Sequence, residues 1–248
     1  MRTKSYFDMH AHHQAYHKAP LFYAQIMDHL KFRLDNGNNK IKVLDLGCGD
    51  GSFIKNLIAG GINAEFIGSD VSSSMIDIAK EKLDDQNNVE WLVCDGFELP
   101  LISRAKFDVI HLDSVLHHLV GKTRSKSRCL SNRLLAILIN RLSKNGILIV
   151  EEMYYNSYLI PQITSFFVFY ALKLLSMLKL DLSKFTSLYQ PGLEVNFFCD
   201  KQIEGMLKNY GDSVYMIKRS PDAIPKLFRM LLLKDWGHIS YSVKAPSS

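Results

Sequence analysis

Short apolar runs alternate with amphipathic stretches along the first half of the chain. Strands are expected over residues 40–46 (KIKVLDL), 64–69 (AEFIGS), 89–94 (VEWLVC), 107–112 (FDVIHL) and 147–151 (ILIVE). Helical patterns are expected between them, over residues 52–59, 72–83 and 125–142. Strands that are apolar on both faces and separated by helices are typical of a parallel sheet covered on both sides. The pattern therefore predicts an α/β fold with a doubly wound, mostly parallel sheet.

The second half does not continue this alternation of strands and helices. Residues 153–193 are aromatic and helical in pattern and end at Pro191-Gly192, which predicts a helical cap insert at 153–195 after the fifth strand. A helix is expected from Asp200, as N-cap, to Tyr210, with Gly211 as its stop. Strands over 214–217 and 238–243, separated by a short helix around 223–230, would complete a seven-stranded sheet. With no repeat or low-complexity linker, we expect a single domain over residues 1–248.

One stretch requires a membrane check. In residues 158–180, 16 of 23 side chains are apolar, whereas a spanning helix needs about 20 mostly apolar residues. Pro161, Gln162, Lys173 and Lys179 interrupt the run. A core or cap helix is therefore expected and no transmembrane helix. A helix that lies on a membrane surface or grips a lipid is the alternative.

Composition narrows the class of protein. The 248 residues are 47% apolar and 22% charged, which is typical of a globular protein and excludes a disordered or collagen-like chain. The four cysteines lie far apart without a CxxC pair, which indicates neither disulfides nor zinc and suggests a reducing, cytoplasmic environment. The histidines near the N-terminus have no accompanying cysteine and no recognised ligand spacing, so no metal is expected. They are His10, His12, His13 and His17.

Charge is divided unevenly along the chain. Residues 1–120 contain 12 basic and 16 acidic side chains, and residues 121–248 contain 18 and 9. An acidic front half joined to a basic back half suggests that the two halves contact different partners.

A glycine-rich loop carries the strongest local signal. The sequence VLDLGCGDG (residues 43–51) follows a strand and opens a helix, where backbone N–H groups can approach an anionic ligand. A nicotinamide-type fingerprint would read G-x-G-x-x-G. Here Ser52 takes the place of the third glycine, Gly51 comes one residue early, and Asp45 precedes Gly47 by two residues.

Acidic residues also follow the next strands. Asp70 ends the second strand, where its carboxylate can accept both hydroxyls of a ribose. Asp95-Gly96-Phe97 ends the third strand, where a carboxylate, a backbone N–H and a ring could meet an adenine. Leu112-Asp113 ends the fourth. The carboxyl ends of parallel strands share one edge of the sheet, so these groups are expected to line one crevice.

On these residues the sequence resembles the class I S-adenosylmethionine-dependent methyltransferases, small-molecule branch. The resemblance covers residues 41–150 well and includes the runs DSVLHHL (113–119) and LSKNGILIVE (142–151). It implies a Rossmann-like fold and S-adenosyl-L-methionine as cofactor, with S-adenosyl-L-homocysteine as product. It also implies an N-terminal lid over residues 1–38, to which Tyr6, Phe7 and Tyr16 are suited. The implied cofactor site comprises Asp45, Gly47, Gly49, Asp70, Val71, Met75, Asp95, Gly96, Phe97 and Leu112. For Met75 and Phe97, plain packing is the alternative.

Two histidines are candidates for catalysis. An alcohol or phenol acceptor must lose a proton, and histidine is the usual general base. His117 and His118 follow the fourth strand, beside the expected position of the methyl group. Packing, helix capping or solvent exposure is the alternative for each.

The acceptor is expected to be a small, hydrophobic metabolite, with O-methylation favoured. The aromatic cap residues suggest a pocket for a large apolar group, although they could equally form the core of the insert or a dimer contact. The basic run at 122–128 could anchor an anionic group or could simply be a solvated helix start. An RNA or protein methyltransferase, a non-methylating nucleoside-binding enzyme and a binding protein of the same fold are the alternatives. Nucleic acid is disfavoured because the Pro-Pro-aromatic and Pro-Cys motifs are missing. A homo-oligomer and peripheral membrane contact stay open.

Overall fold

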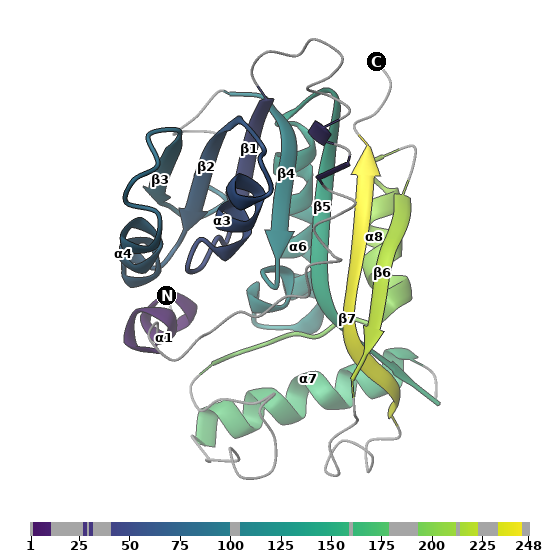
Figure 1. Ribbon diagram of the computed structural model, residues 1–248. Helices are drawn as coiled ribbons and strands as arrows, with labels where there is room; N and C mark the ends of the chain where they lie inside the picture. Colours follow the sequence, from purple (N-terminus) through teal and green to yellow (C-terminus); the bar gives the residue numbers. More distant parts are fainter. Residues whose placement is uncertain are drawn as a thin grey trace.

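The computed structural model describes residues 2–10, 27–28, 30–31, 41–99, 105–158, 161–178, 193–211, 214–222 and 233–244. A seven-stranded sheet in the order β3-β2-β1-β4-β5-β7-β6 forms its centre (Figure 1). The strands are β1 Ile41–Leu46, β2 Ala64–Asp70, β3 Val89–Val93, β4 Phe107–Asp113, β5 Leu142–Ser157, β6 Val214–Pro221 and β7 Leu233–Lys244. The helices are α1 Arg2–His10, α3 Ser52–Ala59, α4 Ser73–Lys82, α6 Arg124–Ile139, α7 Pro161–Leu178 and α8 Asp200–Lys208, with a 3-10 helix at Leu116–His118.

The predicted fold class is confirmed. Strands β1 to β5 pair in parallel, and β7 joins the sheet antiparallel to β5 and β6. Successive residues of β1 point to opposite faces of the sheet, each of which packs in its own apolar cluster. Val43 packs with Phe53 and Leu57 of α3, and Leu44 packs in the cluster that holds α6 and α8. Because helices cover both faces, the central strands are apolar on both sides.

The fifth strand is longer than the sequence pattern indicates. The pattern indicates a strand only over residues 147–151, but β5 begins at Leu142 and continues to Ser157. Asn145 adopts a positive φ of 64° inside the strand. The long pairing with β7, from Ile147↔Lys244 to Ser157↔Leu233, supplies partners far beyond the expected end. Tyr154 and Tyr155 therefore belong to the sheet and not to the cap insert.

The second half contains two further differences. Cys199, not Asp200, is the N-cap residue of α8, and its N–H donates to Gln202 Oε1 at 3.1 Å. Both late strands extend beyond their expected bounds, since each gains hydrogen-bond partners in the β6–β7 hairpin. The helix expected at 223–230 and residues 179–192 of the cap lie outside the described residues.

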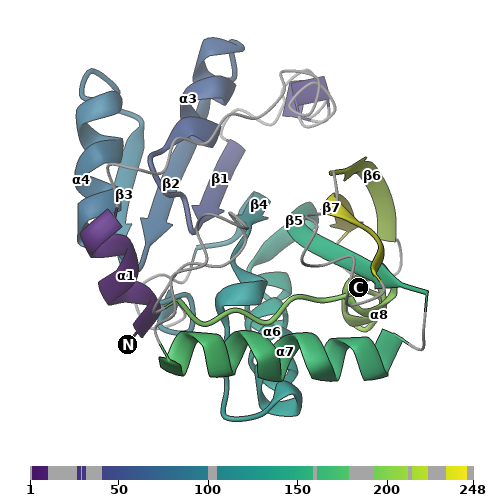
Figure 2. The ribbon, with the colours of Figure 1, turned by 90° about the horizontal axis from the view of Figure 1, so that it is seen from below.

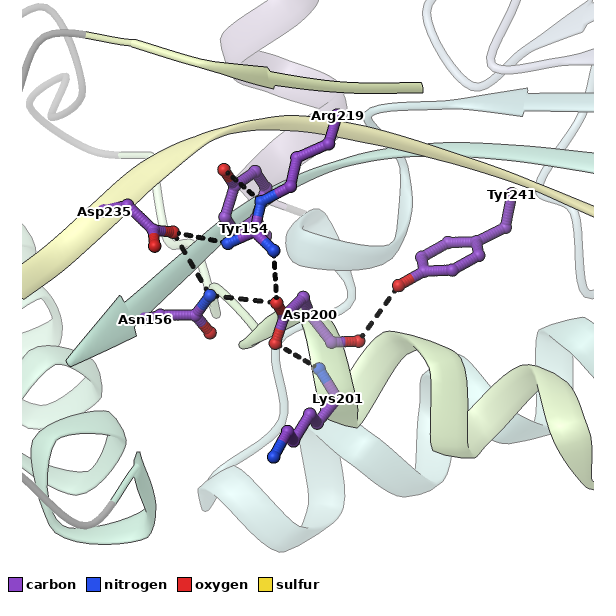
Figure 3. Close-up of polar contacts among 7 residues, drawn as sticks. All are labelled: Tyr154, Asn156, Asp200, Lys201, Arg219, Asp235 and Tyr241. Carbon is purple, nitrogen blue, oxygen red and sulfur yellow. Dashed lines mark hydrogen bonds and ion pairs between the residues drawn. The ribbon is translucent and has the colours of Figure 1, made fainter. Parts of the chain in front are cut away.

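Arg219 ties the antiparallel side of the sheet to α8 (Figure 3). Its guanidinium donates to Asp200 at 3.0 Å and to Asp235 at 2.8 Å, and its Nε donates to the Tyr154 hydroxyl at 2.9 Å. Asn156 joins the same two carboxylates through its side-chain amide. The planar guanidinium thus connects β5, β6, β7 and the start of α8.

Two helices lie at the carboxyl edge of the parallel strands. Figure 2 shows the molecule from that edge. Helix α1 lies beside α4, and α7 runs across the ends of the other elements. Among the described residues, no helix is long and apolar enough to cross a membrane.

Candidate functional site

A cavity of about 280 Å³ opens at the carboxyl ends of β1, β2, β3 and β4. Most of the residues expected to bind a cofactor line it, together with one of the two candidate histidines. These lining residues are Gly47, Gly49, Asp70, Val71, Met75, Asp95, Gly96, Phe97 and His118. The parallel sheet therefore brings together side chains that are up to 71 positions apart in the sequence.

The glycine loop forms one wall of the cavity. Gly47, Gly49 and Gly51 adopt positive φ values of 74°, 52° and 74°, a region that favours glycine. At Gly47, an added Cβ would lie 2.4 Å from Val115 Cγ2. A side chain at that position would therefore clash with the opposite wall of the cavity.

Asp70 links the glycine loop to the start of α4. Its Oδ2 accepts from Gly49 N–H at 3.1 Å, and its Oδ1 accepts from Ser72 N–H at 2.8 Å. Burial raises the pKa of this carboxyl, while the two backbone hydrogen bonds oppose the rise. The carboxylate is held in place by the backbone and still lines the cavity.

Asp95 is the more exposed acid of the site. Its Oδ1 accepts from the Phe97 N–H at 3.0 Å, which folds the turn after β3. The Phe97 ring is capped by the Arg133 guanidinium at 5.3 Å from the ring centroid. Gly96 leaves little space beside it, because an added Cβ would lie 3.0 Å from both Leu134 and Leu46.

Asp45 and Leu112, both expected at the cofactor, do not line the cavity. The Asp45 side chain lies under the glycine loop, where its Oδ1 is 2.7 Å from His111 Nδ1. The other ring nitrogen of His111 is 2.8 Å from Glu151 Oε1. An imidazole that contacts a carboxylate with each nitrogen donates from both, which is the imidazolium form.

His111 is thus a buried positive charge between two acids. Burial alone would lower its pKa, but the carboxylates of Asp45 and Glu151 outweigh burial and raise it to about 9. The Phe53 ring stacks on the imidazole with 3.7 Å between ring centroids. His111 lies outside the motifs that predict the site. A polar residue inside an apolar strand, opposite Asp45 in the β1–β4 register, was the available signal.

The two candidate bases differ in their surroundings. His117 is buried away from the cavity, and both its Nδ1 and its backbone N–H contact the fully buried carboxylate of Glu152. His118 lines the cavity, and its ring lies 5.2 Å from the ring of Phe7. Burial, followed by the neighbouring His117, lowers the pKa of His118 well below its usual value. The imidazole facing the cavity is therefore the neutral form.

Other lining residues lie outside the cofactor set that the resemblance implies. Lys4 and Phe7 of α1 close one side, and Leu119, Val120 and Leu130 close another. Phe7 belongs to the predicted N-terminal lid, and Lys4 precedes it by about one turn of the same helix. Tyr6, the neighbour of Phe7 in the sequence, is buried at 6% exposure. Four other residues named from the N-terminal sequence lie outside the described residues: His12, His13, Tyr16 and His17.

Comparison with known proteins identifies the class to which this fold and site belong. A family model described as a methyltransferase domain matches residues 38–218, which is most of the chain. The chain therefore belongs to the methyltransferase domain family.

Individual relatives are more distant. A malonyl-[acyl-carrier protein] O-methyltransferase from Ilyobacter polytropus is 34% identical over 77 residues, which is 29% of this chain and 29% of that protein. The YcgJ protein of Bacillus subtilis has a TM-score of 0.60 at 13% identity, covering 88% of this chain and 98% of that one. The N-methyltransferase NodS of Bradyrhizobium japonicum, crystallised with S-adenosyl-L-homocysteine, has a TM-score of 0.52 at 13% identity, covering 91% and 88%. At these identities the structural likeness concerns the fold.

Proposed function

We propose that this chain is an S-adenosyl-L-methionine-dependent methyltransferase that acts on a small, hydrophobic metabolite, with O-methylation favoured. The observation that carries the proposal is the cavity at the carboxyl edge, where Asp70 is held by the glycine loop beside Asp95 and Phe97. When bound, the cofactor would supply an activated methyl group.

The lining residues suit this cofactor by charge and shape. Acidic side chains (Asp70, Asp95 and Asp113) match its ribose hydroxyls, amino group and positive sulfonium. The positive φ of Gly47 favours glycine, and Val115 fills the space that a Cβ would occupy there, so the loop backbone itself forms the cavity wall beside Val115. Asp70 would accept from the ribose hydroxyls, and Asp95 with Gly96 would face the adenine edge. Asp45 would contribute indirectly: its carboxylate, held by His111, would support the glycine loop from beneath.

His118 is the favoured general base of the predicted pair. A neutral imidazole at the cavity wall can accept the proton of an alcohol or phenol acceptor. His117, held by Glu152, would fix the backbone from which His118 projects. The chain otherwise contributes proximity and alignment, which is the main requirement of a transfer from an activated donor.

The acceptor side of the cavity supports an apolar substrate that carries an anionic group. Phe7, Leu119, Val120 and Leu130 supply apolar surface, and Lys4, whose ammonium is paired with Asp8 at 2.9 Å, supplies a cation that the substrate would share with that carboxylate. A carboxylate acceptor, as the name of the Ilyobacter relative suggests for that protein, is the second candidate. Because a carboxylate has no proton to lose at neutral pH, loss of His118 would leave its methylation nearly unchanged.

Calorimetry with S-adenosyl-L-homocysteine and with NAD⁺ tests the proposal. We expect the former to bind and the latter to fail, and we expect Asp70→Asn to weaken binding of the former at least tenfold, since hydrogen bonds to a charged group contribute about 1.5–3 kcal/mol. Asp77→Asn is the matched control, because Asp77 is exposed on α4 away from the cavity. Failure of the homocysteine compound to bind, or equal affinity in both variants, would contradict the proposal.

A further inference from the structure

Helix α7 has two apolar faces, of which the sheet covers one. Thr164, Val168, Leu172 and Ser176 recur every fourth residue and are buried, and Val168 and Leu172 pack with Tyr155 of β5 and Trp236 of β7. The opposite side carries an unbroken row of exposed apolar residues, hereafter the apolar stripe. It consists of Ile163, Phe166, Phe167, Tyr170, Leu174, Met177 and Leu178, which are 39–65% exposed among the described residues.

The apolar stripe is too extensive to be an ordinary surface feature. An 18-residue helix is about 27 Å long at 1.5 Å per residue, and the stripe runs from its first turn to its last. Single exposed apolar residues are normal, but a contiguous apolar patch of this length marks an interaction site.

The charge around the stripe is positive. The sequence of α7 contains no acidic residue, and its one cation, Lys173, donates from Nζ to the carbonyls of Gly121 and Lys122 at 3.3 and 3.1 Å. These contacts place the helix directly beside the basic segment at residues 122–128. In that segment Lys122, Lys126 and Arg128 are exposed. The sequence has no acidic residue between Asp113 and Glu151.

We propose that α7 lies on the surface of an anionic lipid bilayer, with the apolar stripe inserted among the acyl chains and the basic segment on the headgroups. Apolar burial and attraction between basic side chains and anionic lipid act together in interfacial helices. The charge argues against a second copy of the chain, because a two-fold interface would bring two basic segments together without acidic residues on either segment to pair them.

This orientation would also bring the cavity to the bilayer. Leu119 and Val120 line the cavity and directly precede Gly121, which contacts α7. If the proposed function is correct, an acceptor with a long apolar part would reach the site from the membrane. The lipid contact itself does not depend on that function.

Vesicle flotation of the full chain tests the contact. We expect the chain to float with vesicles of phosphatidylcholine and phosphatidylglycerol, and to do so more weakly with phosphatidylcholine alone. Phe166→Ser with Phe167→Ser should lower the partition coefficient roughly tenfold to a hundredfold, since each ring carries much of the buried apolar area. Tyr215→Ser with Met216→Ser is the matched control, because both residues are about equally exposed but lie on β6, at 58% and 50%.

A second test variant, with its own control, tests the role of the basic segment. Replacing Lys122, Lys126 and Arg128 by Gln should lower binding to the anionic vesicles at least tenfold and should leave the weak binding to neutral vesicles unchanged. Lys55, Lys80 and Lys144, exposed elsewhere, provide a control with the same loss of charge. Circular dichroism and binding of S-adenosyl-L-homocysteine would show that each variant is folded, separately from its lipid binding.

Several results would overturn the proposal. A wild-type chain that stays at the bottom of the gradient with both vesicle types would contradict it, as would a control variant that loses as much binding as its test variant. A dimer in lipid-free solution that Phe166→Ser with Phe167→Ser dissociates would assign the stripe to a second copy. Binding to an acidic carrier protein but to neither vesicle would assign it to a protein partner.

Discussion

Asp8 Oδ1 accepts a hydrogen bond from Ser72 Oγ at 2.7 Å, which joins the N-terminal helix to the turn after β2. The same hydroxyl accepts from Met75 N–H at 3.3 Å as the N-cap of α4. Lys4, one turn before Asp8, contacts the other carboxylate oxygen at 2.9 Å. The hydrogen bond from Ser72, followed by that from Lys4, lowers the pKa of Asp8. Helix α1 is thereby held over the cavity that its Lys4 and Phe7 line.

Asp8→Ala should loosen this closure without harming the fold. We expect the affinity for S-adenosyl-L-homocysteine to fall about threefold to tenfold, the cost of one hydrogen bond to a charged group at a partly exposed site. The thermal midpoint should change little. Ser72→Ala removes both the contact and the N-cap and should also lower the unfolding free energy by about 1 kcal/mol. Calorimetry and thermal melts separate the two effects. Identical ligand affinity in wild type and Asp8→Ala would show that α1 does not close the site.

His118→Ala should abolish proton removal while leaving the cofactor site intact. For a hydroxyl acceptor we expect kcat to fall about 10²–10⁴-fold, with unchanged affinity for S-adenosyl-L-homocysteine. Labelled methyl transfer into extractable phenols, quinones and lipids measures this. His117→Ala should have a smaller effect, because that side chain contacts Glu152 and does not line the cavity. Equal losses in the two variants would argue against His118 as the base.

The pH dependence of the reaction follows from the lowered pKa of His118. The base form is the neutral imidazole, and it persists down to pH values below the ordinary histidine pKa of about 6.5. We therefore expect kcat to stay level as the pH falls from 8 to 6.5 and to decline only below that range. Imidazole NMR of the ligand-free chain measures the same titration directly. A midpoint at or above 6.5 would contradict the prediction.

Stability should depend on pH through His111. Its pKa is about 9 in the folded chain and about 6.5 when unfolded. The charged His111 therefore adds about 3 kcal/mol to the free energy of unfolding below pH 6.5. This stabilisation is lost as the pH rises through 9. Urea unfolding between pH 6 and 9.5 should show this fall in wild type and a flatter profile in His111→Gln. Subtracting the two profiles removes the titration of other groups. Parallel profiles would show that His111 is neutral.

Arg219→Ala should destabilise the antiparallel side of the sheet. The side chain is about one third exposed (34%), so solvent screens its ion pairs, and we expect a loss of about 1–2 kcal/mol through the hydrogen bonds and the stacking on Tyr154. Arg219→Lys should recover only part of this loss, because an ammonium cannot reproduce the planar fork. Chemical denaturation measures both, with the exposed Arg128→Ala as control. A loss no larger than that of the control would contradict the prediction.

Local patterns predicted much of the fold and of the cavity. Helix α3 begins and ends where its pattern indicates, and α4 lies within the helical pattern expected over residues 72–83. These features depend on neighbours a few residues apart, as do the glycine turn and the acids at the strand ends. Once β1, β2 and β3 are parallel neighbours, their carboxyl ends must meet. The clustering of Asp70 and Asp95 therefore follows from the order of elements alone.

Long-range contacts decided the rest. The length of β5 depends on β7, which lies some ninety residues later, and the burial of Asp45 depends on its register opposite His111 in β4. His117 and His118 are adjacent in sequence, yet only packing sends one to Glu152 and the other to the cavity. The aromatic segment has apolar residues at 16 of the 23 positions from 158 to 180 and these lie on both sides of the helix, so its pattern could not distinguish a covered face from an exposed one. Local sequence patterns are sufficient to predict most of the helices and strands and the edge of the sheet that carries the chemistry. Which side chain faces which neighbour depends on burial by residues far away in the sequence, which no local pattern contains.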